Sequence, residues 1–80
     1  MKQKKYGKYI IADPKICHGQ LTVKGTRILV ENVLSLVAKG MSCDKIINEW
    51  HGKVSKEAIS EAVNLASQAL QEKNGIHFKN

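Results

Sequence analysis

The sequence has few cysteines and no long apolar run. Cys17 and Cys43 are its two cysteines, and we interpret them as reduced thiols in a reducing compartment. No C-x-x-C pair occurs. His18 and His51 are the candidates that could join the cysteines as metal ligands, and they do not form a ligand pair, so we expect no metal and no cofactor. No run of 18 apolar residues occurs, and no apolar stretch of signal-peptide length follows the charged start. We therefore expect a cytoplasmic protein that does not enter a membrane.

Catalytic motifs are also absent. The sequence contains no G-x-S-x-G, no P-loop and no H-E-x-x-H motif. Each of its histidines, His18, His51 and His77, falls near a predicted turn or a terminus. Most acidic residues are predicted to lie on outward helix faces, near caps or lysines. Since an enzyme needs titratable groups that converge in a cleft, we predict that the protein binds a partner and is not an enzyme.

Negative charge is almost missing from the first third of the chain. The formal net charge is +6. Residues 28–80 balance six lysines against six acidic residues, whereas residues 1–27 hold one acidic residue, Asp13, against seven basic ones. A concentrated basic segment indicates an anionic partner, for which nucleic acid is the usual candidate. The alternative is a lysine-rich segment that serves solubility alone.

Eighty residues allow one domain, and its first third has the pattern of strands and turns. Residues 9–11 favour a strand, which Asp13 and Pro14 end. Residues 20–23 and 26–29 flank Lys24 and Gly25, and we predict that they pair as a β-hairpin with Gly25 in the turn.

The remainder has the pattern of three helices. The first begins at about residue 30 and ends at Gly40; Ser42 caps the second, which runs to Trp50; Ser55 caps the third, which runs to about residue 72. We therefore predict a mainly α fold, a three-helix (winged) helix-turn-helix domain with a short N-terminal β-hairpin. Its predicted limits are 9–72, with a basic arm at 1–8 and a polar tail at 73–80.

The third predicted helix carries two apolar stripes. One contains Ile59, Val63, Ala66 and Leu70, and the other contains Ala58, Ala62, Leu65 and Ala69. One stripe is enough for the core of the domain itself. The alanine-rich stripe allows close approach, either to the hairpin or to a twin helix, and we favour a homodimer because small chains often complete their burial that way.

If the protein binds DNA, the third helix is the one expected in the major groove. Its outward face offers Lys56, Ser60 and Asn64, although Glu57 and Glu61 on the same predicted face are unfavourable near phosphate. We expect phosphate contacts from the hairpin and the arm, at Lys24, Arg27, Lys4 and Lys5. Arg27 has a structural alternative, in which it binds a carboxylate or helix-end carbonyls.

The tail offers a second candidate contact. Ile76 and Phe78 alternate with polar residues, which suggests a short strand or a partner-binding segment.

Two stretches carry a family resemblance. They are I-I-A-D-P-K-I-C-H-G-Q-L-T-V-K-G-T-R-I-L-V and A-K-G-M-S-C-D-K-I-I-N-E-W. With the apolar helix between them they resemble domain-of-unknown-function family 433, over about residues 9–70. The match is most specific at G-T-R-I and G-M-S, residues 25–28 and 40–42. The chain departs from the family pattern at His18, Thr22, Leu29 and the pair Trp50-His51, where glycine, proline, proline and tyrosine-proline are usual.

The resemblance implies a winged or homeodomain-like helix-turn-helix fold and a VapB-type antitoxin. Such an antitoxin neutralises a PIN-like ribonuclease toxin and represses its own operon by binding operator DNA. The competing hypothesis is a protein-interaction module without a nucleic-acid role.

Overall fold

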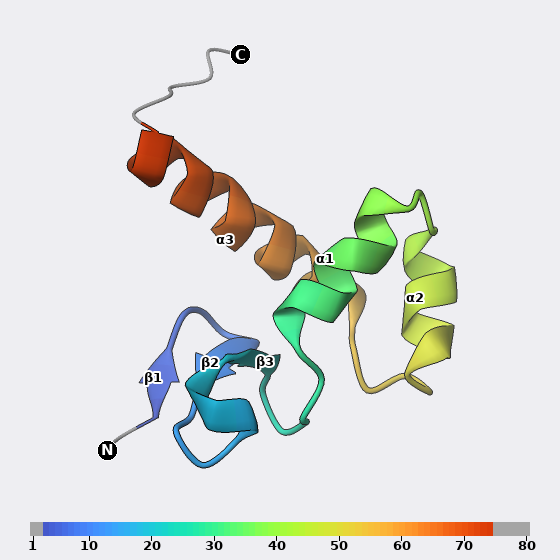
Figure 1. Ribbon diagram of the computed structural model, residues 1–80. Coiled ribbons are helices and arrows are strands. Elements are labelled where there is room, and N and C mark those ends of the chain that lie inside the picture. The colour runs from blue at the N-terminus through green and yellow to red at the C-terminus, as the bar shows by residue number, and fades with distance from the viewer. Residues whose placement is uncertain (1–2, 75–80) are drawn as a thin grey trace.

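The computed structural model describes residues 3–74 and contains three short strands followed by three helices (Figure 1). The strands are β1 (Lys4–Lys5), β2 (Ile10–Ala12) and β3 (Leu21–Val23), and a single 3-10 turn (Cys17–Gly19) precedes β3. The helices are α1 (Val30–Ala38), α2 (Cys43–Glu49) and α3 (Lys56–Asn74). Helix α3 thus continues past residue 72, where we expected it to end.

The sheet is antiparallel, in the order β1-β2-β3. Strand β3 pairs with β2, where Ile10 lies opposite Val23 and Ala12 opposite Leu21. The predicted hairpin between residues 20–23 and 26–29 is therefore wrong, and a single bridge between Thr22 and Leu29 is all that remains of it. Lys4–Lys5 form the opposite edge strand, so two residues of the predicted arm belong to the sheet.

Thr26 explains why residues 26–29 do not form a strand. Its hydroxyl donates to the carbonyl oxygen of Val23 (2.8 Å) and accepts from the amide of Ile28 (3.0 Å). The Thr26 amide also donates to the Val23 oxygen (3.0 Å). These local bonds close a compact loop and use the polar groups that an extended strand would need. Strand β3 pairs instead with β2, whose Ile10 and Ile11 are 0% and 2% exposed.

The helix starts follow the predicted caps. The Ser42 hydroxyl accepts from the amide of Lys45 (3.2 Å), and the Ser55 hydroxyl accepts from the amide of Ala58 (3.1 Å). Each bond satisfies one of the amides that a first turn leaves without an intrahelical partner. Both cap predictions are confirmed.

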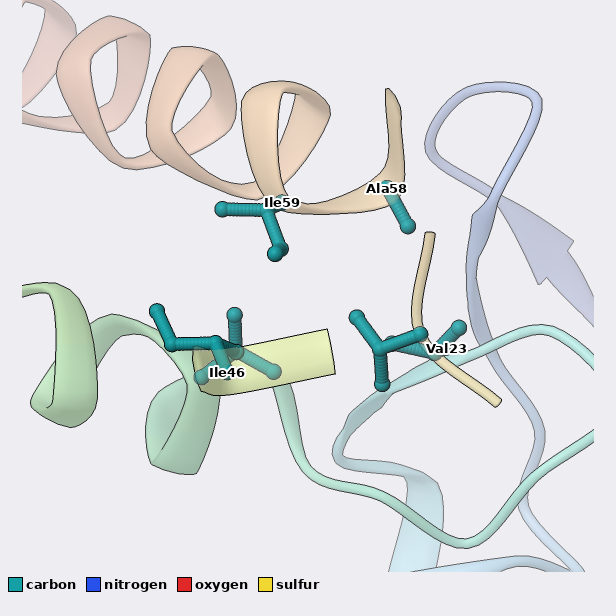
Figure 2. Packing of buried hydrophobic residues seen from close by; sticks show 6 residues of the cluster. Val23, Ile46, Ala58 and Ile59 are labelled. Atoms are coloured by element: carbon teal, nitrogen blue, oxygen red, sulfur yellow. The ribbon is translucent and has the colours of Figure 1, made fainter. Parts of the chain in front are cut away.

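Helix α3 joins the two parts of the core. Its Ala58 and Ile59 pack in the main cluster, on the side of the helix that faces Val23 of β3 and Ile46 of α2 (Figure 2). One turn on, Ala62 packs with Ile10 and Val30 in a second cluster. Small side chains let the helix lie close to both the sheet and α1.

The first half of the alanine-rich stripe of α3 is buried within the domain, because Ala58 and Ala62 are each 1% exposed. Leu65 is half-buried and Ala69 is exposed, so the stripe packs inside the domain at its start and reaches the surface at its end. The other stripe is the more exposed one, with Val63 at 40% and Leu70 at 58%. No helix within residues 3–74 has the length and apolar character needed to cross a bilayer.

Thr22 is a buried polar side chain whose replacement we expect to stabilise the protein. It is 0% exposed, and its hydroxyl has no hydrogen-bond partner among residues 3–74. Thr22→Val keeps the shape and removes the cost of that burial, so the free energy of unfolding should rise by about 1 kcal/mol. Thr26→Val is the matched control and should lower it by about 1–2 kcal/mol, because that hydroxyl makes two bonds. Urea denaturation measures both free energies. A loss of stability in Thr22→Val would show that the Thr22 hydroxyl makes a stabilising hydrogen bond.

Candidate nucleic-acid interface

Lys56, Ser60 and Asn64 form one stripe along the first half of α3. They are four residues apart and exposed, so their side chains follow one face of the helix. We call them the α3 polar stripe. They line a shallow groove of about 350 Å³, whose other walls are apolar side chains of the three helices and of the loop between α1 and α2: Val37, Met41, Cys43, Ile46, Ile59 and Val63.

Glu61 does not lie on the outward face where we expected it. Its carboxylate reaches the N-terminal segment and accepts hydrogen bonds from the backbone amides of Lys8 (2.8 Å) and Tyr9 (2.7 Å). A Cβ on Gly7 would collide with this carboxylate, so the glycine leaves room for the contact. Glu61 is half-buried, whereas Glu57 is exposed. Glu57 is thus the one of the two predicted carboxylates that remains on the outer surface of α3.

Lys24 and Arg27 lie in the loop that follows β3, and both are exposed. The Lys24 amide donates to the carbonyl oxygen of Tyr9 (2.8 Å), which fixes the start of this loop against β2. The carbonyl oxygen of Arg27 accepts from the Cys17 thiol (3.6 Å). The Arg27 guanidinium has no hydrogen bond or ion pair within residues 3–74. The contact that its structural interpretation requires is therefore missing from that part of the chain.

Lys4 and Lys5 lie on β1, at the sheet edge opposite to β3. The Lys4 ammonium is 5.1 Å from the centre of the Tyr6 ring, a cation–π distance. The predicted partner-binding residues Ile76 and Phe78 lie outside the described residues.

The predicted site residues therefore fall into three groups. The α3 polar stripe is one group, Lys24 with Arg27 is the second, and Lys4 with Lys5 is the third. None of the described side chains forms an ion pair, so the lysines and Arg27 are not neutralised by neighbouring carboxylates. Within residues 3–74 there is also no cluster of three metal-ligating side chains.

Arg27 lines a second, open pocket of about 680 Å³, between the loop after β3 and the loop between α2 and α3. We call it the Trp50 pocket, and its lining residues are Ile16, Gly25, Thr26, Arg27, Ile28, Trp50, His51 and Lys53. The sequence predicted the end of one helix at Trp50 and the cap of the next at Ser55, and it assigned no role to Lys53 between them. No local signal brings Lys53 to Arg27, because the two loops meet only in the folded chain.

The ends of α1 and α2 have the same hydrogen-bond pattern but different residues at the same position. After α1, the amide of Gly40 donates to Val37 and that of Met41 to Leu36 (3.0 and 3.2 Å). After α2, the amide of His51 donates to Asn48 and that of Gly52 to Ile47 (3.1 and 2.9 Å). Both ends are Schellman motifs, whose first residue beyond the cap takes a left-handed conformation. Glycine occupies it after α1 (φ 83°), whereas His51 occupies it after α2 (φ 55°).

We expect His51→Gly to raise the free energy of unfolding by about 1 kcal/mol, because a left-handed residue with a Cβ costs about that much relative to glycine. Gly40→Ala is the matched control. A Cβ there meets nothing within 4 Å, so the left-handed backbone alone should lower stability by a similar amount. Thermal and urea denaturation compare the two. A loss of stability in His51→Gly would mean that the imidazole makes a stabilising contact.

Fold and site together define a small domain in which three helices pack with a short antiparallel sheet, with unpaired cationic side chains on its surface. Residues 10–66, more than half of the chain, match the family described as "Protein of unknown function (DUF433)". The chain belongs to this family, as the resemblance indicated. No curated protein and no solved structure gives a significant match.

Proposed function

We propose that the protein is a DNA-binding regulator of the helix-turn-helix type, in which α2 and α3 are the helix pair. The observation that carries the proposal is the α3 polar stripe, which leaves Lys56, Ser60 and Asn64 exposed on the first half of the helix that follows a short one. In such domains the first turns of the second helix contact base edges in the major groove. Asn64 and Ser60 have the donors and acceptors for that contact, and Lys56 would bind phosphate.

The location of Glu61 favours this proposal. On the outward face its carboxylate would oppose phosphate, but it is bound to the amides of Lys8 and Tyr9. Lys24, Arg27, Lys4 and Lys5 would supply further phosphate contacts, which position a protein on DNA without reading sequence. The β2–β3 side of the sheet, which carries Lys24, would then serve as the wing.

We extend the proposal to an antitoxin that represses its own operon and neutralises a PIN-like ribonuclease toxin in the cytoplasm. The support is membership of the family, together with the resemblance that implies this role. A homodimer would present two copies of α3 to an operator with two half-sites. Since Ala58 and Ala62 are buried, the dimer contact would use exposed positions farther along α3, such as Ala69.

The test is a fluorescence-anisotropy titration of the protein with duplex DNA from upstream of its own gene, against a scrambled duplex, over 50–300 mM salt. Each phosphate contact steepens the fall of log K with log salt by about 0.9, so several contacts give a steep slope. No binding at 50 mM salt, or a flat salt response, would refute DNA binding. For the antitoxin role, co-expression with the neighbouring gene product should yield a complex, and a neighbour unlike a nuclease would contradict it.

A protein-interaction module is the second candidate. The observation in its favour is the apolar lining of the groove beside the α3 polar stripe, where Val37, Met41 and Val63 contribute. If the protein is an interaction module, replacing Lys2, Lys4, Lys5 and Lys8 by glutamine leaves its function unchanged. If it is a DNA-binding protein, the same replacement weakens its function.

A further inference from the structure

The Trp50 pocket combines an apolar floor with unpaired cationic and donor groups. Ile28 and Trp50 pack against the main core with part of their surface and line the pocket with the rest. Arg27 and Lys53 lie at the pocket, no carboxylate is among its lining residues, and neither cation has a bond within residues 3–74. The hydroxyl of Thr26 is already used by Val23 and Ile28, so the side chains free to bind a ligand are Arg27, Lys53, His51 and the Trp50 indole.

Both walls of the pocket are held by the fold. The Thr26 bonds close the first wall, and the Cys17 thiol holds the carbonyl of Arg27. In the second wall the amide of Lys53 donates to Trp50 (3.0 Å), directly after the Schellman motif of α2. A preformed site loses less entropy when it binds a ligand than a loop that must first become ordered.

His51 is a further feature of this wall, and it is one of three described non-glycine residues with a left-handed backbone, beside Cys17 and His18. It holds a left-handed position with φ 55°, where the same motif after α1 has glycine, and its side chain lines the pocket. Residues kept in an unfavourable backbone conformation cluster at binding and catalytic sites. A glycine would suit the backbone better but would remove an imidazole from the pocket.

We propose that the Trp50 pocket docks an acidic peptide segment of a protein partner. One apolar side chain of the peptide would cover Ile16, Ile28 and Trp50, and flanking carboxylates would pair with Arg27 and Lys53. The unopposed positive charge argues for an acidic ligand. The open shape argues for an inserted side chain of a larger partner, because pockets for small molecules enclose most of the ligand surface. Trp50 packs against the core with part of its surface, which reduces the ring area on which a nucleic-acid base would stack.

The proposal is independent of DNA binding, and the two have different tests. Arg27 belongs to both, so the pocket variant is Lys53→Gln/His51→Gly, and Lys39→Gln/Lys45→Gln is the control of surface lysines outside the pocket. The full-length protein is used to select from a displayed library of random 12-residue peptides. The enriched peptide is then synthesised and titrated, with the fluorescence of Trp50, the single tryptophan of the chain, as the readout.

We expect the enriched peptides to share an apolar residue flanked by acidic ones. The pocket variant should bind the synthetic peptide at least tenfold more weakly, and the control variant within twofold of the wild type. The pocket variant should keep its melting temperature or raise it, and should bind the operator duplex like the wild type. Thermal unfolding therefore separates loss of the site from loss of the fold.

Three outcomes would overturn the proposal. The first is a selection that enriches no acidic-apolar sequence over a parallel selection with the pocket variant. The second is an enriched peptide that binds both proteins equally, which places its site elsewhere. The third is a single-stranded 12-nucleotide DNA that displaces the peptide, binds more tightly than the peptide and loses this binding in the pocket variant; nucleic acid is then the occupant.

Discussion

Replacing Glu61 by alanine should lower the free energy of unfolding by about 2–3 kcal/mol, a large fraction of the stability of an 80-residue domain. The carboxylate accepts from two successive amides, at 2.8 and 2.7 Å, across more than 50 residues of sequence. Hydrogen bonds to a charged acceptor are stronger than neutral ones, and the loss would leave the Tyr9 amide in a part-buried place without an acceptor. The expected loss is at the low end of the range for two hydrogen bonds to a charged acceptor, because the Lys8 bond is exposed to solvent.

Gly7 offers a double-mutant cycle for the same contact. A Cβ at Gly7 would collide with the Glu61 carboxylate, so Gly7→Ala should lose about 1–2 kcal/mol while Glu61 is present. Once Glu61 is alanine, the added methyl group meets no carboxylate and should cost little. Glu49→Ala, an exposed carboxylate in α2, is the control and should change stability by less than about 0.5 kcal/mol. Additive effects of Gly7→Ala and Glu61→Ala in urea denaturation would show that the two residues do not interact.

The helices of this fold could be predicted because their signals are local. Ser42 and Ser55 cap the helices that directly follow them, and Gly40 ends α1, so each boundary depends on residues within a few positions. The strand partners depend on distant residues. Residues 26–29 are the nearest strand partner in sequence for Leu21–Val23. The strand nevertheless pairs with the segment that contains the buried Ile10 and Ile11.

The site follows the same division. The α3 polar stripe could be placed because helical spacing alone puts Lys56, Ser60 and Asn64 on one face. Neither the inward turn of Glu61 nor the meeting of residues 25–28 with 50–53 could be read from spacing, since both depend on how α2 and α3 fold back on the sheet. The Glu61 contact removes a carboxylate from the proposed DNA surface. The meeting of the two loops forms a separate pocket.

The second large effect concerns the charges that would contact DNA. Lys24→Gln/Lys56→Gln removes two proposed phosphate contacts, one from the loop after β3 and one from α3. The salt slope of operator binding should become shallower by about 1.8, and the affinity near 100 mM salt should fall on the order of 50-fold. A charge-matched control is Lys15→Gln/Lys39→Gln, which removes two exposed lysines from outside the proposed DNA surface.

The two double variants have the same net charge, so a nonspecific attraction between a basic protein and DNA would weaken equally in both. A localised interface would weaken in the first and stay within about threefold in the second. Asn64→Ala adds the remaining distinction, because a residue that reads a base edge should lower affinity for the operator while affinity for the scrambled duplex is unchanged. Equal losses on both duplexes would show that α3 holds the DNA backbone without reading its sequence.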